Sequence, residues 1–333
     1  MPKPISDYDY LSVSARIHAM ENRLLTKERT ERMLEARSAG EAAKVLSECG
    51  YRELEELTPG GIEGMLDAAR LDLFRDLQKA APNPLLVEAF SMKYDYHNAK
   101  ALVKARAMGL SADALLIDAG RYPAKSLQEE FHKDDLRSVG ETFRKAVTDA
   151  AAILAQTGDP QKADFLLDRA YFAELLETAG AFGDPFLLGY VTLSIDTANL
   201  RAAVRSARMG RDGDFLKKVL IPGGSVDTET LTGAISGSGD LAGAVGHGPL
   251  ENAAIAGGHA LEGGSLTEFE RLCDDAVMAY LASAKRVAFG PAPLIGYLYA
   301  REAEFTAIRV ILSGRLAGLE SDVLRERLRV SYV

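Results

Sequence analysis

Residues 84–115 read PLLVEAFSMKYDYHNAKALVKARAMGLSADAL, and the chain repeats this pattern twice more without a gap. Residues 185–216 read PFLLGYVTLSIDTANLRAAVRSARMGRDGDFL, and residues 293–324 read PLIGYLYAREAEFTAIRVILSGRLAGLESDVL. The shared positions are a proline, an acid, a base, a glycine, a second acid and a leucine: Pro84, Asp95, Lys100, Gly109, Asp113 and Leu115; Pro185, Asp196, Arg201, Gly210, Asp214 and Leu216; Pro293, Glu304, Arg309, Gly318, Asp322 and Leu324. Ungapped agreement of this length indicates copies of one unit.

Each copy predicts a helix, a glycine turn and a second helix. Proline suits the first turn of a helix, because its missing N–H would have no partner there. Apolar residues then recur at helical period, and a glycine just past the end can take the left-handed conformation that closes a helix. Asp113, Asp214 and Asp322 stand where an N-cap would start the next helix.

The rest of the chain also favours helices. Between Tyr8 and Leu25 the apolar positions recur about 3.6 residues apart, and Thr26 is placed to cap a second helix. Ser38 and Glu41 form a capping-box pattern. Alternating β-branched runs with Asn-Gly turns are missing, so the sequence predicts an all-α protein. The glycine-rich stretch at residues 222–265 predicts short helices joined by loose turns.

Length predicts more than one hydrophobic core. The 333 residues exceed the roughly 250–300 at which a single core stops growing. We expect three helical-bundle repeats, at residues 1–109, 110–210 and 211–333, the last with the glycine-rich insertion at about 222–265. Copies that associate head to tail make a pseudo-threefold ring or funnel where the rotation closes, and an open stack where it does not.

Composition argues against several classes of partner and compartment. The 39 Lys and Arg against 48 Asp and Glu give a net charge of -9, which opposes attraction to nucleic acids and anionic lipids. Asp7 and Asp9 stand where an export signal would need a basic start. The longest uncharged, mostly apolar stretch, residues 287–300, is shorter than the ~18 residues that span a bilayer. We therefore expect no nucleic-acid partner and no direct membrane insertion.

Two cysteines, Cys49 and Cys273, form neither a CxxC pair nor a zinc-site spacing. Cys49 follows Val45 and Leu46 on an expected amphipathic helix, so it is interpreted as a small buried residue. This usage suits a reducing cytosol.

No catalytic constellation is complete. Asp134-Asp135 and Asp274-Asp275 resemble the magnesium-binding aspartates of helical prenyl-transferring enzymes, but the third carboxylate is missing, which favours solvated helix ends. Glu129 and His132 match half of a di-iron site that needs a second copy. Residues 237–242 fit a dinucleotide glycine fingerprint, but no strand precedes them.

Histidine and serine patterns are equally incomplete. HExxH and GxSxG motifs are absent, and the histidines do not recur at repeat positions: His18, His97, His132, His247 and His259. The sequence therefore predicts no catalytic, cofactor-binding or metal-binding residue, and no enzyme.

Charged residues recur in the copies. The acids Asp95, Asp196 and Glu304 precede the bases Lys100, Arg201 and Arg309 by five positions, which is too far around a helix for a good local pair. They are interpreted as capping or interdomain groups, with a partner-facing ring of charge as the alternative. Further arginines stand beside the repeat glycines, where we expect either partner-facing charges or solvated helix ends: Arg106, Arg208 and Arg315.

Several stretches resemble one known family. They are Tyr8-x-x-Leu11 to Arg16, Met33-Leu34-Glu35-Ala36 to Cys49-Gly50-Tyr51, the Asp-x-x-Asn-x-(Lys/Arg) pattern at residues 95–100 and 196–201, and residues 297–319. Together they resemble the C subunit of archaeal and bacterial V-type (A-type) ATPases, whose eukaryotic counterpart is the d subunit of the vacuolar ATPase. The third copy departs from the pattern, with Ala307 where the first two have Asn98 and Asn199.

This resemblance implies an all-helical funnel of three similar domains. It implies a non-catalytic rotor subunit on the cytoplasmic end of the membrane proteolipid ring, which receives the foot of a central shaft formed by subunits D and F. Its role would be to transmit torque for ATP synthesis or for proton or sodium pumping, without a cofactor or nucleotide. The main alternative is an all-helical repeat scaffold that binds a soluble partner. A metal-dependent helical transferase is a more distant one.

Overall fold

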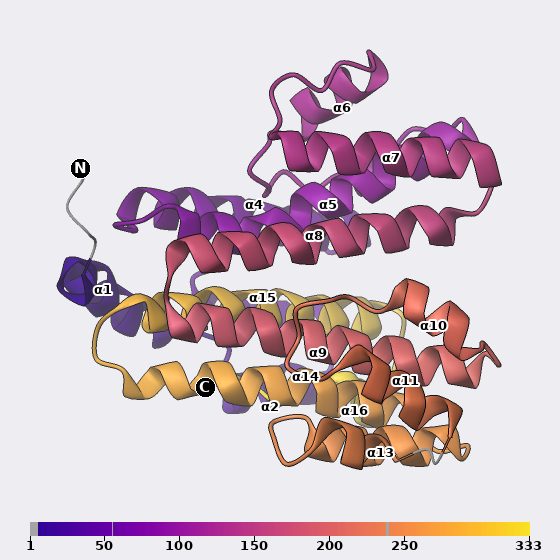
Figure 1. Cartoon of the computed structure of the whole chain (residues 1–333). Helices are drawn as coiled ribbons and strands as arrows, with labels where there is room; N and C mark the ends of the chain where they lie inside the picture. Colours follow the sequence, from indigo (N-terminus) through magenta and orange to yellow (C-terminus); the bar gives the residue numbers. More distant parts are fainter. Residues whose placement is uncertain (1–5, 55, 238–239) are drawn as a thin grey trace. The chain divides into compact units, whose positions relative to one another are not determined.

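The computed structural model describes residues 6–54, 56–237 and 240–333, which contain helices and no strand (Figure 1). The all-α prediction is confirmed. The α-helices are α1 (Leu11–Glu21), α2 (Lys27–Glu35), α3 (Ala39–Val45), α4 (Pro59–Ala80), α5 (Leu85–Met108), α6 (Ala124–His132), α7 (Glu141–Thr157), α8 (Pro160–Phe182), α9 (Pro185–Arg208), α10 (Gly213–Val219), α11 (Thr228–Ser236), α12 (Leu241–Val245), α13 (Glu251–Leu261), α14 (Leu266–Ala282), α15 (Pro291–Leu316) and α16 (Ser321–Arg327). The 3-10 helices are η1 (Asp7–Tyr10), η2 (Leu46–Cys49), η3 (Asp113–Leu115) and η4 (Ser283–Arg286).

The chain divides into two compact units. Unit 1 consists of Met1–Ala69, Asp196–Leu220 and Gly224–Val333, and unit 2 of Arg70–Ile195 and Ile221–Gly223. Both boundaries between large segments fall inside long helices, α4 and α9. These units do not follow the repeat positions, so the three-repeat division and its pseudo-threefold closure stay predictions.

The three repeated helices form as the pattern predicts. α5 and α9 have 24 residues each and α15 has 26. The repeat glycines that follow them, Gly109, Gly210 and Gly318, have φ of 65°, 67° and 73°. This left-handed region penalises any residue with a Cβ, which explains why glycine recurs there.

The expected N-caps of the following helices are wrong by one or two residues. Asp212, not Asp214, caps α10 and accepts a hydrogen bond from the Phe215 N–H at 2.8 Å. Glu320 precedes α16, and the first copy forms only the short turn η3. The predicted aspartates lie instead in the first turn of each element, where a negative charge is also favourable.

Unit 2 is a helical bundle around α5. α8 packs against both α5 and α7, and α6 packs against α5. Aromatic rings fill the interior: Tyr96 meets Phe143 edge-on with centroids 5.1 Å apart, and Phe90 stacks on Tyr190 at 5.2 Å. Such pairs add to the stabilisation from buried apolar area.

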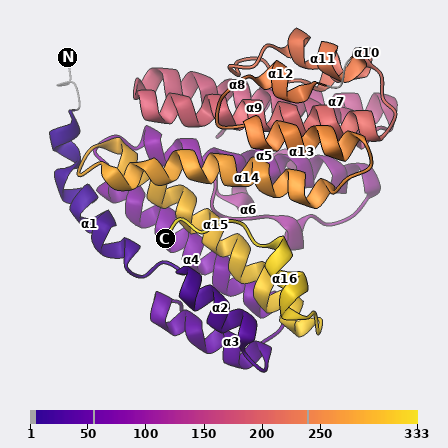
Figure 2. The same cartoon turned by 90° about the horizontal axis from the view of Figure 1, so that it is seen from below.

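Unit 1 contains the first and the last helices of the described chain, which pack against each other. α1 and α3 pack against α15, and α2 packs against α16, as Figure 2 shows. Leu324 of α16 lies so close to α15 that a Cβ on Gly314 would come within 2.2 Å of its side chain. α13 and α14 pack together and α14 also contacts α15.

The glycine-rich region forms α11, α12 and α13 joined by turns, as expected. Within the glycine fingerprint at 237–242, residues 238–239 lie outside the described residues, and Asp240 caps α12. No helix among the described residues combines the length and the apolar character needed to cross a membrane.

Candidate functional site

The acids at the first charged repeat position are buried. Asp95, Asp196 and Glu304 are 0%, 3% and 5% exposed. An ionised carboxylate this deeply buried must be paired or hydrogen-bonded, so the donors around each one show what it does. Burial contradicts the alternative in which these acids form a partner-facing ring.

Asp95 holds the segment that follows the first glycine turn. Its carboxylate accepts from Arg121 Nε at 2.6 Å and from the Tyr122 N–H at 3.3 Å, and Arg121 also reaches Glu174 at 2.6 Å. Burial raises the pKa of Asp95 to about 6, and the Arg121 charge opposes that rise. A neighbouring repeat residue, Asn98, exchanges two hydrogen bonds with the backbone of Ile117.

Asp196 binds a turn in the same way with different donors. Its carboxylate accepts from the Ser225 N–H at 3.0 Å, the Ser225 hydroxyl at 2.5 Å and the Val226 N–H at 3.0 Å. The donors again follow the glycine turn of their own copy.

Glu304 receives its donors from the N-terminal segment. The Leu25 N–H donates at 2.5 Å, the Tyr51 hydroxyl at 2.6 Å and Arg301 Nη1 at 2.5 Å. Burial, and then the negative charge of Glu304, raise the pKa of Tyr51 well above its ordinary value. The third copy is thus completed by residues more than 250 positions earlier in the chain.

The bases five residues later tie each long helix to another helix. Lys100 Nζ lies 2.5 Å from Asp168 of α8, and Arg309 makes a bidentate pair with Glu63 of α4 at 2.5 and 2.7 Å. Arg201 pairs with Asp274 of α14. We call these three ion pairs the repeat ties. Each tie lies within one compact unit, so the interpretation of these bases as interdomain groups stays a prediction.

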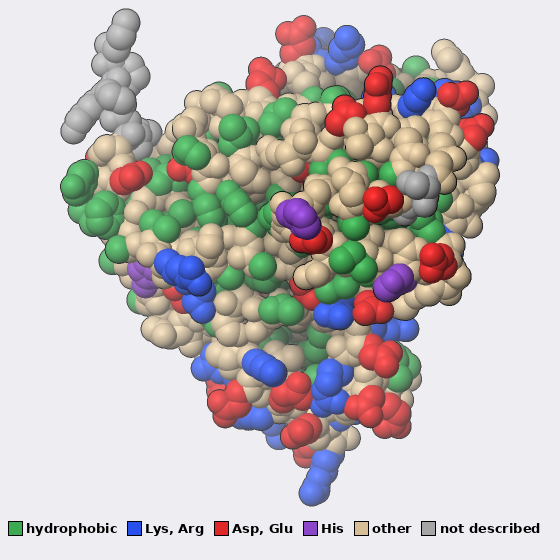
Figure 3. All heavy atoms as spheres, turned by 60° about the horizontal axis from the view of Figure 1, so that its bottom comes forward, with side chains coloured by type: hydrophobic (Ala, Val, Ile, Leu, Met, Phe, Trp, Pro, Cys, Tyr) green, Lys and Arg blue, Asp and Glu red, His purple; other side chains and the backbone are tan. Residues whose placement is uncertain are grey.

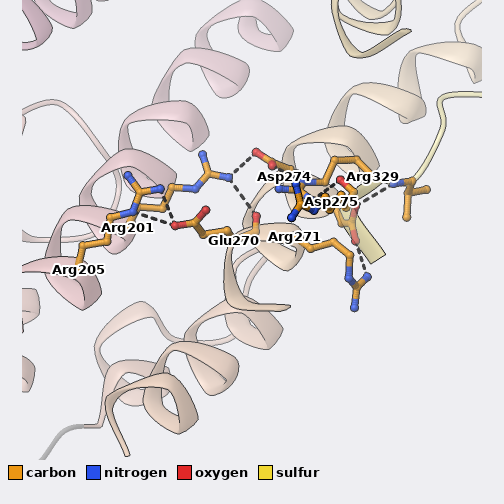
Figure 4. Close-up of polar contacts among 9 residues, drawn as sticks. Arg201, Arg205, Glu270, Arg271, Asp274, Asp275 and Arg329 are labelled. Atoms are coloured by element: carbon orange, nitrogen blue, oxygen red, sulfur yellow. Dashed lines mark hydrogen bonds and ion pairs between the residues drawn. The ribbon is translucent and has the colours of Figure 1, made fainter. Parts of the chain in front are cut away.

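Asp274 and Asp275 lie in a network of arginines, as Figure 4 shows. Asp274 also accepts from Arg329 Nε at 2.6 Å, and Asp275 accepts from Arg271 at 2.9 Å and from the Val330 N–H at 3.0 Å. Guanidinium groups occupy the carboxylates that a magnesium ion would need. The expectation of a solvated helix end is wrong here, because both residues lie within α14 and are partly buried.

Asp134 and Asp135 agree better with the expected solvated helix end. Asp134 follows α6 with its side chain 80% exposed, and Asp135 pairs with the exposed Arg137 at 2.6 Å. Glu129 and His132 lie on α6. Among the described residues, no group of three or more His, Cys, Asp or Glu side chains could hold a metal ion.

Two of the arginines beside the repeat glycines satisfy the ends of other helices. Arg106 donates to the Phe131 carbonyl of α6 and packs over the Phe131 ring, and Arg208 donates to the Ala260 carbonyl of α13 at 2.5 Å. The last carbonyls of a helix have no partner within it, so these arginines act as caps. Arg315 is half-buried.

The cysteines are buried, and two of the histidines contact oxygen atoms of other residues. Cys49 and Cys273 are both buried, and burial raises their pKa values to about 11 and about 12. His97 contacts the Leu115 carbonyl at 3.0 Å, and His247 pairs with Glu251 at 2.9 Å. The buried-cysteine interpretation is confirmed.

The sequence pattern missed the partners of the repeated charges. Arg121, Ser225 and Tyr51 share no residue type, and Glu63 lies outside the aligned copies. The usable signal was distance along the chain: the donors to Asp95 and Asp196 lie 26 to 30 positions downstream. The same distance from Glu304 leads to the last residues of the sequence, so it does not point to the N-terminal donors.

Comparison with known proteins shows which family the chain resembles. The chain is 26% identical over 331 residues to the C subunit of the V-type sodium ATPase of Enterococcus hirae, with 97% of this chain and 99% of the relative covered. It is also 26% identical over 342 residues to the C subunit of the A-type ATP synthase of Methanocaldococcus jannaschii (96% and 86% covered) and over 345 residues to the C subunit of the V-type ATP synthase of Deinococcus radiodurans (96% and 91%). Because the family model of the ATP synthase (C/AC39) subunit matches residues 13–327, the chain belongs to that family.

Proposed function

We propose that the chain is a non-catalytic rotor subunit of a V/A-type ATP synthase that links the central shaft to the membrane proteolipid ring. The observation that carries the proposal is the family match over residues 13–327. In this role the chain lies peripherally on the cytoplasmic face of the membrane. It binds shaft subunits D and F and the proteolipid ring, and performs no bond chemistry.

The described contacts support a mechanical role. An adaptor that transmits torque must resist shear between its helices, and every repeated helix is fastened twice, by a buried acid to a loop and by a repeat tie to another helix. Breaking one of the two buried ion pairs, Asp95 with Arg121 or Glu304 with Arg301, leaves an uncompensated charge, which costs several kcal/mol. The partly exposed repeat ties contribute less. Such contacts resist displacement more strongly than apolar packing that can slide.

The proposal extends to the arrangement of the repeats. Repeats at residues 1–109, 110–210 and 211–333 would close into a pseudo-threefold funnel around the foot of the shaft. Its support is the recurrence of one tie in three places: α5 with α8, α9 with α14, and α15 with α4. The last of these joins the third repeated helix to the beginning of the chain.

Co-purification tests the role directly. The chain is tagged in its native host, membranes are solubilised gently, and accompanying proteins are identified by mass spectrometry. We expect the shaft subunits, the proteolipid and the ATP-hydrolysing head. Recovery of soluble proteins alone, with an intact motor in a strain that lacks the chain, would leave the helical scaffold for a soluble partner as the better function.

A further inference from the structure

The loop at residues 287–290, which leads into α15, is fastened to the N-terminal helices. The Tyr8 ring lies against the Phe289 ring with centroids 5.5 Å apart. The buried Ser14 hydroxyl lies 3.3 Å from both the nitrogen and the oxygen of Gly290. Because Gly290 is the N-cap of α15, these contacts set where α15 begins relative to α1.

His18 makes a third contact with this loop and has a particular geometry. Its Nδ1 lies 3.0 Å from a carboxylate oxygen of Glu21, and its Nε2 lies 3.2 Å from the carbonyl oxygen of Ala288. Both neighbours are acceptors, whereas a neutral imidazole carries a single N–H. Only the doubly protonated ring donates to both. In either neutral tautomer, one ring nitrogen turns a lone pair toward an oxygen lone pair.

We propose that His18 is a proton-dependent latch between α1 and the loop at residues 287–290. The imidazolium donates to Glu21 and to Ala288 together and holds the loop against α1. Loss of the proton removes one of these hydrogen bonds and loosens the start of α15. The inference concerns unit 1 alone and does not depend on the proposed rotor role.

The surroundings of His18 support protonation in the folded chain. The hydrogen bond with Glu21 raises the pKa of His18, burial opposes this, and the Ala288 carbonyl raises it further. A histidine whose pKa is raised by folding stabilises the fold fully below its unfolded pKa of about 6.5. That stabilisation is lost as the pH rises through the folded pKa. The latch is therefore closed in acid and opens toward alkaline pH.

The other titratable groups at this junction come from four elements. They include Glu21 of α1, Asp7 and Tyr8 of η1, Lys285 and Arg286 of η4, and Tyr332 of the C-terminal segment. Lys285 Nζ lies 3.4 Å from the Tyr332 carbonyl, and burial and the Glu21 charge raise the pKa of the Tyr332 phenol. The first ten residues of α15 contain no Asp, Glu, Lys, Arg or His. Histidine is the group whose ordinary pKa places its charge change between pH 5 and 8.

Histidine NMR on the full chain tests the protonation step. The exposed His259 serves as the internal reference. We expect the titration midpoint of His18 to lie above that of His259. Glu21→Gln should bring the two midpoints together while both histidines remain. A His18 midpoint at or below that of His259 would overturn the proposal.

Hydrogen exchange tests the latch itself. After correction for the intrinsic rate, exchange of the amides at 287–290 should accelerate severalfold between about pH 5.5 and pH 8. His18→Gln should show the faster rate at both pH values, and the control His259→Gln should follow the wild type. Circular dichroism checks that the variants are folded. Exchange in the loop that ignores pH in the folded wild type would contradict the latch.

Discussion

At the scale of single residues, the buried Glu304 accepts hydrogen bonds from three different residues, Leu25, Tyr51 and Arg301. Arg301, itself nearly buried, depends on it as an ion-pair partner. Glu304→Gln removes the negative charge and leaves the guanidinium buried without compensation, which costs about 3–5 kcal/mol. Tyr51→Phe removes one hydrogen bond to the same carboxylate and should cost only about 1–2 kcal/mol. Urea unfolding of both variants gives the comparison, and equal losses would show that the Arg301 pair contributes nothing.

The raised pKa of Asp95 predicts a pH dependence with a definite sign. Its folded pKa of about 6 lies above the unfolded value near 3.9, so between these values the folded state binds more protons. Stability contributed by Asp95 therefore falls as the pH rises from about 4 to about 6, and is constant above. One pH unit of separation corresponds to about 1.4 kcal/mol, so the fall is at most about 3 kcal/mol.

Unfolding free energies of the wild type and Asp95→Asn, measured from pH 4 to pH 7, check this dependence. The advantage of the wild type over the variant should shrink through that range and then level off. A constant difference would mean that Arg121 cancels the effect of burial on the carboxyl group.

The sequence predicted the positions of the repeated acids better than the residues that donate hydrogen bonds to them. The spacing alone singled out Asp95, Asp196 and Glu304, because equivalent helices place equivalent side chains in the interior. Apart from Arg301 of α15, the donors lie in loops, where a backbone N–H, a hydroxyl or a guanidinium satisfies a carboxylate equally well. Because a carboxylate accepts several types of donor, the three copies share no residue type at the donor positions.

At the scale of helices, the contact of α15 with α16 depends on a residue without a side chain. A Cβ at Gly314 would meet the buried Leu324 at 2.2 Å. Gly314→Ala should therefore destabilise the protein by about 1–3 kcal/mol, the usual cost of overpacking a core. Leu324→Ala in the same chain should remove most of the added cost of the alanine. Thermal unfolding measures all of these variants.

Gly180→Ala is the matched control for that prediction. Gly180 lies within α8, and nothing stands within 4 Å of a Cβ built there. The general preference of helices for alanine over glycine should raise stability by about 0.5–1 kcal/mol at this position. If Gly314→Ala raised stability as the control does, the Leu324 side chain would be able to move aside for the added methyl group.

Helices were predicted well, and their ends less so. Thr26 caps α2 and Ser38 caps α3, as expected. The capping box is only half formed, because the Glu41 carboxylate accepts from the Arg37 N–H instead of from Ser38. Apolar periodicity extends over many residues, whereas a cap is one local choice among several nearby acceptors.

At the scale of the whole molecule, the three repeat ties connect elements far apart in the sequence. Arg309 and Glu63 are separated by 246 positions. No local sequence pattern predicts such a pair. The repeated positions could therefore be found from the sequence, whereas the ion-pair partners of the repeated bases could not. In contrast, Arg325 of α16 pairs with Glu31 of α2, and both side chains are partly exposed. Figure 3 shows Lys, Arg, Asp and Glu side chains intermixed at the lower end of that face.

The proposed rotor role predicts that one of these pairs matters for coupling and the other does not. Both pairs are partly exposed, so neither Arg309→Glu nor Arg325→Glu should unfold the protein. In the assembled ATPase, Arg309→Glu should lower ion transport per ATP hydrolysed, because α4 and α15 then slip under torque. Arg325→Glu should leave that ratio unchanged. The exchanged pair Glu63→Arg with Arg309→Glu should restore coupling, and a loss that the exchange does not repair would assign Arg309 a role other than its tie to α4.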